Sequence, residues 1–202
     1  KRRYTGIQHY ALPYTLFFYG GIMKKGEIYE GRVQEVLFPD KAIVVTDEGE
    51  TAQVKYGIPG QKLRFRVKKK RKEKIEGILL EVLEKSADET ACLCEWAGKC
   101  GGCLYQTLPY EKQLAIKEAQ IKKMLDNGGT DYTFEGIVSS PVVSGYRNKV
   151  ELTFGDSYMG GPLALGMHQR GSFYDIAGIE TCQIMTHDMR MAAMTVLDHF
   201  QN

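Results

Sequence analysis

The chain has 202 residues, of which 43% are hydrophobic and 26% charged, which predicts a soluble globular protein of one ordinary domain or two small ones. The formal net charge of +2 hides a local basic patch, because Lys62–Lys74 holds nine Lys or Arg residues against one acid. Four of the five cysteines fall within Cys92–Cys103. Such clustering argues against a disulfide framework and favours a metal site in a reducing, cytoplasmic compartment.

Residues 1–22 are expected to be a leader or extension that precedes a natural start at Met23 and lies outside the fold. The stretch Tyr4–Met23 has no Lys, Arg, Asp or Glu, which superficially suggests a signal or membrane segment. A proline, a glutamine, a histidine and four tyrosines interrupt its apolar residues, however, and no small-residue cleavage site is evident. We therefore expect no association with a membrane.

Residues 23–85 carry a series of short strand patterns separated by turn residues. In one of them Leu63, Phe65 and Val67 alternate with Lys and Arg, so one face should be buried and the other should form a cationic stripe. Five strands in so short a segment predict a small closed barrel of the OB type, because an open sheet would leave its edges unpaired. The predicted strands are Glu27–Val36, Lys41–Thr46, Thr51–Val54, Lys62–Lys68 and Ile75–Leu83.

Residues 86–202 predict a second domain of the α+β class. A cysteine-rich loop is followed by a helix over about Tyr110–Asp126, which Gly128 and Gly129 should end. A last helix is expected from a Thr186 cap to Asn202, and its apolar stripe, which needs a packing partner, suggests that the protein continues. The predicted strands are Tyr146–Phe154, Leu163–His168 and Phe173–Ile176, the last two joined by a turn at Gln169–Ser172.

The strongest chemical signal is Cys94, then five intervening residues, then Cys100-Gly-Gly-Cys103, with Cys182 far downstream. Converging thiolates suit an iron-sulfur cluster, and paired glycines let the backbone turn tightly between two ligands. Neither common ferredoxin spacing fits, and a four-cysteine zinc site would favour two close pairs where only Cys100 and Cys103 form one. A cluster, a zinc ion and plain buried cysteines all stay open on spacing alone. Cys92 is expected to pack rather than to bind.

The basic run Lys68–Lys72 is predicted at the turn between two barrel strands. Its continuity with the cationic stripe favours a surface that contacts RNA phosphates, since counterion release rewards several aligned cations. The alternative is a solvated loop. The candidate RNA-binding residues in this run are Lys68, Lys69, Lys70 and Arg71.

A second candidate RNA surface is Tyr146–Lys149. On a strand, Arg147 and Lys149 would share one face while Asn148 would lie with Tyr146 on the other, an arrangement suited to unstacked RNA bases. A half-exposed strand of any domain could have the same pattern. No glycine-rich nucleotide-binding loop follows a buried strand anywhere in the chain.

In their order and spacing, these features resemble the RNA uracil-5 methyltransferases of the RumA type across roughly Met23–Asn202. The features that carry the resemblance are the basic five-stranded barrel, Cys94 with Cys100-Gly-Gly-Cys103, Tyr146-Arg147-Asn148-Lys149, Leu165-Gly166-Met167-His168 and Cys182.

The resemblance implies a mainly β first domain, a TRAM barrel over residues 23–85 that grips RNA, and a central α+β domain over residues 86–202. It implies that a [4Fe-4S] cluster is held by Cys94, Cys100, Cys103 and Cys182, and that Arg147, Asn148 and Lys149 lie near the RNA. A C-terminal Rossmann-like domain that binds S-adenosylmethionine and supplies the catalytic residues would be absent. The full-length protein would then methylate ribosomal RNA, with 23S favoured, or transfer RNA.

Residues 1–22 match nothing in that family, and no catalytic residue is expected in the chain. We therefore expect an inactive, monomeric portion of the enzyme that binds RNA and the cluster. Two other classes stay open: a stand-alone RNA-binding protein with a TRAM barrel, and a zinc-containing nucleic-acid adaptor.

Overall fold

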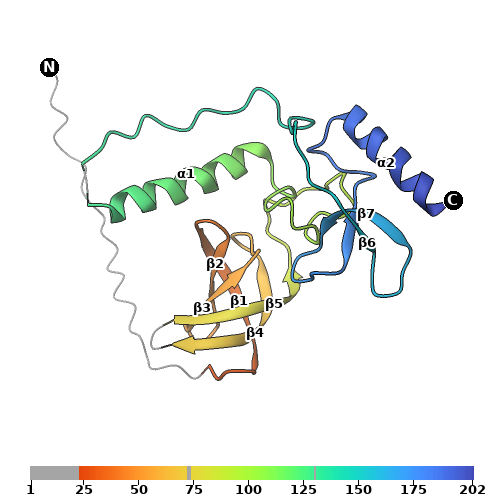
Figure 1. Cartoon of the computed structure of the whole chain (residues 1–202). Coiled ribbons are helices and arrows are strands. Elements are labelled where there is room, and N and C mark those ends of the chain that lie inside the picture. The colour runs from red at the N-terminus through yellow and green to blue at the C-terminus, as the bar shows by residue number, and fades with distance from the viewer. Residues whose placement is uncertain (1–22, 72–73, 130) are drawn as a thin grey trace, which may run out of the picture.

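The computed structural model describes residues 23–71, 74–129 and 131–202, so the predicted leader and Lys72 lie outside the described part. The described residues form a β-barrel, a helix laid along it, and a small three-stranded sheet with a second helix (Figure 1). The barrel strands are β1 (Ile28–Leu37), β2 (Lys41–Val45), β3 (Thr51–Lys55), β4 (Lys62–Arg71) and β5 (Lys74–Glu84). None of the described helices is long and apolar enough to cross a membrane.

The barrel is closed in the order β1-β2-β3-β5-β4, with a parallel pairing of β3 and β5. Alternate residues of β4 point inward, and Leu63, Phe65 and Val67 are fully buried. Gly77 of β5 faces Phe65 so closely that an added Cβ would lie 2.6 Å from the ring. The predicted five-stranded closed barrel is confirmed, with strand ends shifted by only a few residues, because a period of two fixes which side chains enter the core.

The cations at the start of the outer face of β4 are paired with carboxylates from its two neighbouring strands. Arg64 donates to Glu30 of β1 at 2.8 Å and to Glu81 of β5 at 2.7 Å. Lys62 lies 3.6 Å from the same Glu30, and the hydrogen bond from Arg64 holds the pKa of that carboxyl below its ordinary value. The prediction of a continuous cationic stripe is therefore wrong for this half of β4, where the charges are paired across the sheet.

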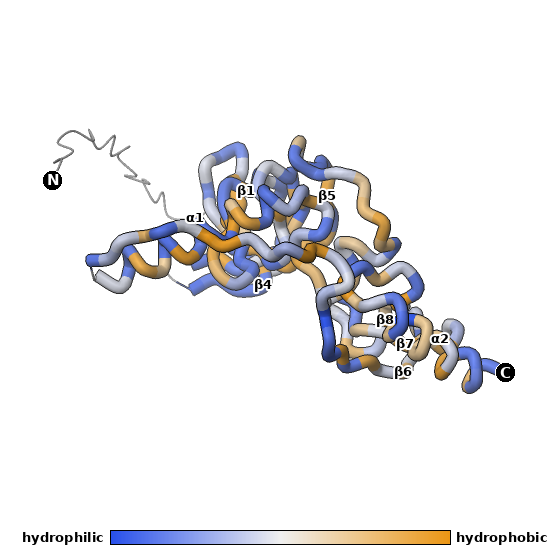
Figure 2. The backbone as a smooth tube through the Cα atoms, turned by 90° about the horizontal axis from the view of Figure 1, so that it is seen from above, coloured by the Kyte–Doolittle hydropathy of each residue, from blue (hydrophilic) through white to orange (hydrophobic). Residues whose placement is uncertain are grey.

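The second part consists of α1 (Tyr110–Asn127), β6 (Thr153–Asp156), β7 (Leu163–His168), β8 (Ile176–Gly178) and α2 (His187–Gln201). Helix α1 lies against β1 of the barrel, where the Gln120 amide donates to the Val36 carbonyl and Lys123 pairs with Glu35 at 2.7 Å. Figure 2 shows α1 beside the barrel strands, with the β6–β8 sheet and α2 at the other end of the molecule. The helix thus packs on the barrel, and its Gln120 side chain also donates to the hydroxyl of Tyr105, two residues after Cys103.

Two predicted strands differ from the structure. Residues 146–152 form no strand, since Arg147 makes only an isolated bridge with Met185 and the strand begins at Thr153. The third strand is β8, which begins at Ile176, whereas Phe173 lies in the preceding turn. The turn itself is as predicted, with Gly171 at a φ of 78°. Helix α2 also begins as predicted, because the Thr186 side chain accepts a hydrogen bond from the Met189 amide.

Candidate metal centre

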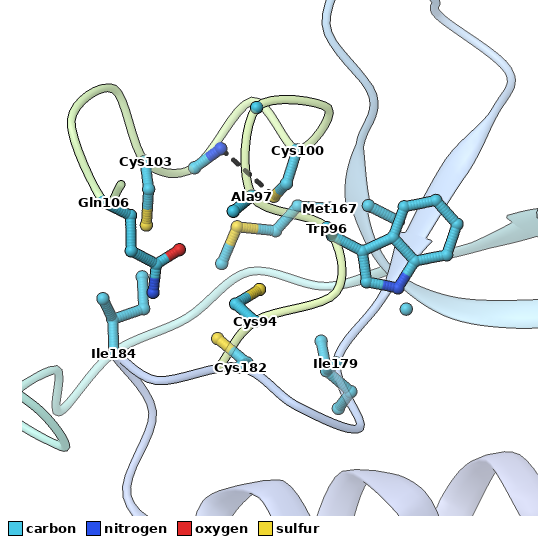
Figure 3. A pocket seen from close by; sticks show the side chains of 14 residues that line it. Cys94, Trp96, Ala97, Cys100, Cys103, Gln106, Met167, Ile179, Cys182 and Ile184 are labelled. Atoms are coloured by element: carbon cyan, nitrogen blue, oxygen red, sulfur yellow. Dashed lines mark hydrogen bonds between the residues drawn. The ribbon is translucent and has the colours of Figure 1, made fainter. Parts of the chain in front are cut away.

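Four cysteines from two distant segments line one small cavity. They are Cys94, Cys100, Cys103 and Cys182, and the remaining wall is mostly apolar, with Trp96, Met167, Ile179 and Ile184. Figure 3 shows the four sulfur atoms around this space. Cys92 does not line it. The structure therefore brings together the four cysteines that the resemblance implies as ligands.

The cysteine loop is held against the end of β7 by backbone contacts. The Gly101 amide donates to the His168 carbonyl at 3.0 Å, and the Cys100 amide donates to the Trp96 carbonyl at 2.8 Å. An added Cβ on Gly102 would lie 2.5 Å from the Met167 sulfur. The lack of a side chain at the second glycine of the pair thus leaves room for the Met167 thioether of β7.

Hydrogen-bond donors surround two of the sulfur atoms. The Gly102 amide donates to the Cys100 sulfur at 3.3 Å. The Cys94 sulfur is hydrogen-bonded by the Trp96 backbone and the Thr181 side chain, both of which favour its thiolate form. Donors aimed at sulfur are the outer-shell interactions that stabilise thiolate ligands of a metal or cluster.

Burial opposes the thiolate form where no cation is present. Burial first, and then the neighbouring Cys100, Cys182 and Cys94, together raise the pKa of Cys103 to about 11, while Arg147 acts in the opposite direction. The pKa of Cys94 is likewise raised, chiefly by burial. These thiols would therefore release protons on binding a metal, which makes metal affinity dependent on pH.

The donor set fits a thiolate-ligated metal or cluster by its chemistry: four soft sulfurs, an apolar wall and donors to sulfur. Among the described residues, no three His, Cys, Asp or Glu side chains stand in metal-binding geometry. Support for a metal or cluster thus comes from the cavity that the four cysteines share and from the chemistry of its wall.

Arg170, which no pattern in the sequence indicates, links the cysteine loop to the barrel. Its guanidinium donates to the carbonyls of Cys100 at 3.1 Å, of Cys103, and more weakly of Leu104 at 3.4 Å. The same group lies 4.7 Å from the centre of the Tyr56 ring, in the loop after β3. Burial lowers the pKa of Arg170, yet the guanidinium remains charged at neutral pH. A second arginine, Arg190, donates to the Cys182 carbonyl at 2.8 Å and has no such ring contact with the barrel.

The segment that precedes β6 runs beside Cys182. The Gly145 amide donates to the Gln183 carbonyl at 2.8 Å and the Arg147 amide to the Ile184 carbonyl at 3.0 Å. Arg147 is therefore placed next to the cysteine cavity, and its charge acts on Cys103. Asn148 is exposed, and Lys149 forms an exposed ion pair with Glu151 at 3.0 Å. The prediction that these residues lie on a strand is wrong, because the single bridge between Arg147 and Met185 is not extended by pairing of the residues on either side.

The basic run lies at the end of the β4–β5 hairpin, away from the cysteine cavity (Figure 1). Strand β4 continues to Arg71, so these cations stand on a strand end and not in a longer turn. The Lys70 ammonium donates to the Met23 carbonyl at 3.0 Å. Within the part of the chain that the structure describes, Lys68, Lys69 and Arg71 form no ion pair.

No protein-family model matches the chain. It is 40% identical over 180 residues to a protein of Clostridium tetani and 43% identical over 171 residues to one of Caldanaerobacter subterraneus. Each of the two is named an uncharacterized RNA methyltransferase. The alignments cover 89% and 84% of this chain but 39% and 38% of the relatives, so the chain spans about two fifths of their length.

A solved structure has a similar fold. The tRNA (uracil-54, C5)-methyltransferase of Pyrococcus abyssi, in complex with S-adenosyl-L-homocysteine, matches with a TM-score of 0.53 and 22% identity. The match covers 85% of this chain and 36% of that one. The expected similarity to RNA methyltransferases is thus confirmed, for a segment that corresponds to about two fifths of the length of those relatives.

Proposed function

We propose that the chain is the RNA-binding, iron-sulfur portion of an S-adenosylmethionine-dependent RNA (uracil-5-)-methyltransferase. The observation that carries the proposal is the shared cavity of Cys94, Cys100, Cys103 and Cys182, placed beside a five-stranded barrel in a chain similar to proteins named RNA methyltransferases. Residues 23–85 would be the TRAM barrel and residues 86–202 the cluster domain. We assign S-adenosylmethionine binding and methyl transfer to portions of the full-length protein that this sequence does not include.

The cluster domain would hold a [4Fe-4S] cluster through the four cysteines. When bound, the cluster would supply a rigid cross-link between the loop around Cys100 and the segment around Cys182. A structural role of this kind suffices, because methyl transfer to uracil carbon 5 needs no electron transfer. The protein's own groups keep that cross-link in place: Arg170 and Arg190 fix the carbonyls of three of the ligands, and the Gly102 amide is aimed at a sulfur. The apolar wall limits access of water.

RNA would be held at two places. Lys68, Lys69 and Arg71 at the hairpin end would contact phosphates, with Lys70 beside them. Arg147, next to the cysteine cavity, would act on the target nucleotide, with Asn148 and Lys149 at the exposed side of the same segment. The target is a ribosomal or transfer RNA, and the partner in both cases is a structured RNA whose target base must leave its stack.

The test of the metal assignment is the metal content of anaerobically purified protein. We expect brown protein with about four iron atoms per chain. Stoichiometric zinc without iron would contradict the cluster and favour the zinc-containing adaptor.

The test of the RNA assignment is the salt dependence of binding. Replacing Lys68, Lys69 and Arg71 by Gln should weaken binding to every RNA sequence alike and should reduce the slope of log K against log salt by about 2, at ~0.7 per lost phosphate contact. The matched control replaces three α1 lysines, Lys112, Lys122 and Lys123, each of which is paired with a carboxylate. Equal slopes for the two triple variants would contradict the assignment of the hairpin end.

Arg147 is tested in the full-length enzyme. Arg147→Ala should lower methylation far more than RNA affinity, because a contact with the extruded nucleotide acts mainly after encounter. Equal losses would make it an ordinary phosphate contact. The chain alone should transfer no methyl group.

A further inference from the structure

The turn between β7 and β8 presents two consecutive aromatic side chains to solvent. Phe173 is 87% exposed and Tyr174 84% exposed. Neither ring takes part in the ring–ring or cation–π contacts of the described residues. Exposed rings of this size forgo the free energy that their burial would yield, so a partner that covers them gains it.

The turn that carries the rings is fixed by its own hydrogen bonds. The Ser172 amide donates to the Gln169 carbonyl at 3.2 Å, and the Gln169 amide donates to the Asp175 carbonyl at 2.9 Å. The Ser172 hydroxyl accepts from the amides of Tyr174 at 3.2 Å and Asp175 at 3.0 Å. A turn that is already ordered loses little conformational entropy when a ligand binds to it.

The same turn is anchored where the cysteine loop meets the barrel. It contains Arg170, whose amide donates to the Lys99 carbonyl at 2.7 Å and whose guanidinium holds Cys100 and Cys103 and faces Tyr56. The turn belongs to the β6–β8 sheet, and its Arg170 reaches the Tyr56 ring of the barrel. A ligand on the exposed rings would therefore lie on the turn that joins the cysteine loop to the barrel.

The chemistry around the rings distinguishes between partners. The other side chains of the turn are polar, namely Gln169, Arg170, Ser172 and Asp175, so the two rings stand among charged and hydrogen-bonding groups. The neighbouring Lys99 is exposed and forms no ion pair within the described part of the chain. Aromatic rings beside cations are the usual means of binding unpaired bases and their phosphates.

We infer that Phe173 and Tyr174 form a stacking platform for unpaired bases of RNA. The inference rests on the proposed function, because both assign RNA as the ligand. It adds a separate binding site on the chain and a preference for single-stranded over paired RNA. Because every base has a stacking face, the platform selects for unpaired structure and not for sequence.

The test compares binding of a fluorescent oligouridine and of a fully paired RNA hairpin to the intact chain. Phe173→Ala with Tyr174→Ala should weaken oligouridine binding by at least about tenfold, as expected for the loss of one or two stacked bases. Hairpin binding and the salt slope should not change, because the phosphate contacts remain. Tyr132→Ala is the matched control, an exposed tyrosine whose hydroxyl donates to Asp126 near the end of α1.

Two further variants separate stacking from a structural effect. The exchange Phe173→Tyr with Tyr174→Phe should retain binding, and Phe173→Trp should lose tryptophan fluorescence when oligouridine stacks on it. Unchanged oligouridine affinity of the double alanine variant, or equal losses for oligouridine and hairpin, would overturn the platform. If the unaltered chain binds neither RNA, the proposed function fails as well, so the two failures are distinguished by the unaltered chain alone.

Discussion

Arg170→Ala tests whether one arginine holds the cysteine loop and the barrel together. The substitution removes hydrogen bonds to the carbonyls of Cys100, Cys103 and Leu104 and the contact with the Tyr56 ring. A hydrogen bond from a charged donor contributes about 1.5–3 kcal/mol, and a cation–π contact about 0.5–2 kcal/mol. These contributions share one side chain and are not additive, so we expect the free energy of unfolding to fall by about 3–5 kcal/mol.

The measurement is denaturant and thermal unfolding of the loaded protein. A loss of that size corresponds to a decrease in Tm of roughly 6–20 °C for a chain of this length. Arg170→Lys should be intermediate, because one ammonium cannot reproduce the planar fork that serves the carbonyls of Cys100, Cys103 and Leu104. Arg190→Ala is the matched control, since it removes a single hydrogen bond to the Cys182 carbonyl and no ring contact.

The link to the barrel is measured separately by a double-mutant cycle of Arg170→Ala and Tyr56→Leu. We expect a coupling energy of about 0.5–2 kcal/mol between the two positions. Tyr56→Phe keeps the ring and should behave like the parent protein. A coupling energy of zero, or equal effects of Arg170→Ala and Arg190→Ala, would show that Arg170 serves only the cysteine loop.

Other substitutions test the cavity, the sheet and the last helix. Cys182→Ser should lose the iron that Cys92→Ser retains, and equal iron contents would show that the ligand set is wrong. Gly166→Ala should prevent folding of the β6–β8 sheet, because its Cβ would lie 1.8 Å from the Ala177 carbonyl oxygen; a native circular dichroism spectrum would refute this. Thr186→Ala should cost about 1 kcal/mol in denaturant unfolding through loss of the α2 cap, whereas no change would mean that the cap is replaced by water.

The barrel could be predicted from the sequence because its signals are local. The alternation of Leu63, Phe65 and Val67 with charged residues indicates which side of β4 is buried, and it does so without knowledge of the neighbouring strands. The Thr186 cap and the glycines after α1 are equally local, and the two helices begin and end close to the predicted residues.

What could not be predicted depends on which segments become neighbours. Lys62 and Arg64 of β4 are paired with carboxylates because the strand register sets Arg64 between Glu30 and Glu81, and register is a property of three strands together. Tyr146–Val150 has the alternation of a strand but lies beside no strand with which to pair, apart from the single bridge at Arg147. The role of Arg170 has no pattern in the sequence at all, since its partners are backbone carbonyls in a distant loop.

The separation of the cysteines also predicts how the chain should respond to loss of metal. The core of the barrel is built mainly from its own strands, with Tyr105 and Leu108 added from the start of the second part, so we expect most of its stability to survive loss of the metal. The cavity joins the loop around Cys100 to the distant Cys182, and a clip that closes so long a loop lowers the entropy of the unfolded chain. Removing the metal with a chelator should therefore give two unfolding transitions, in which the β6–β8 region unfolds first and the barrel remains folded. Hydrogen exchange of the amides of β4 and β7 before and after chelation measures this: we expect faster exchange in β7 alone, and equally faster exchange in both strands would show that the barrel depends on the cavity after all.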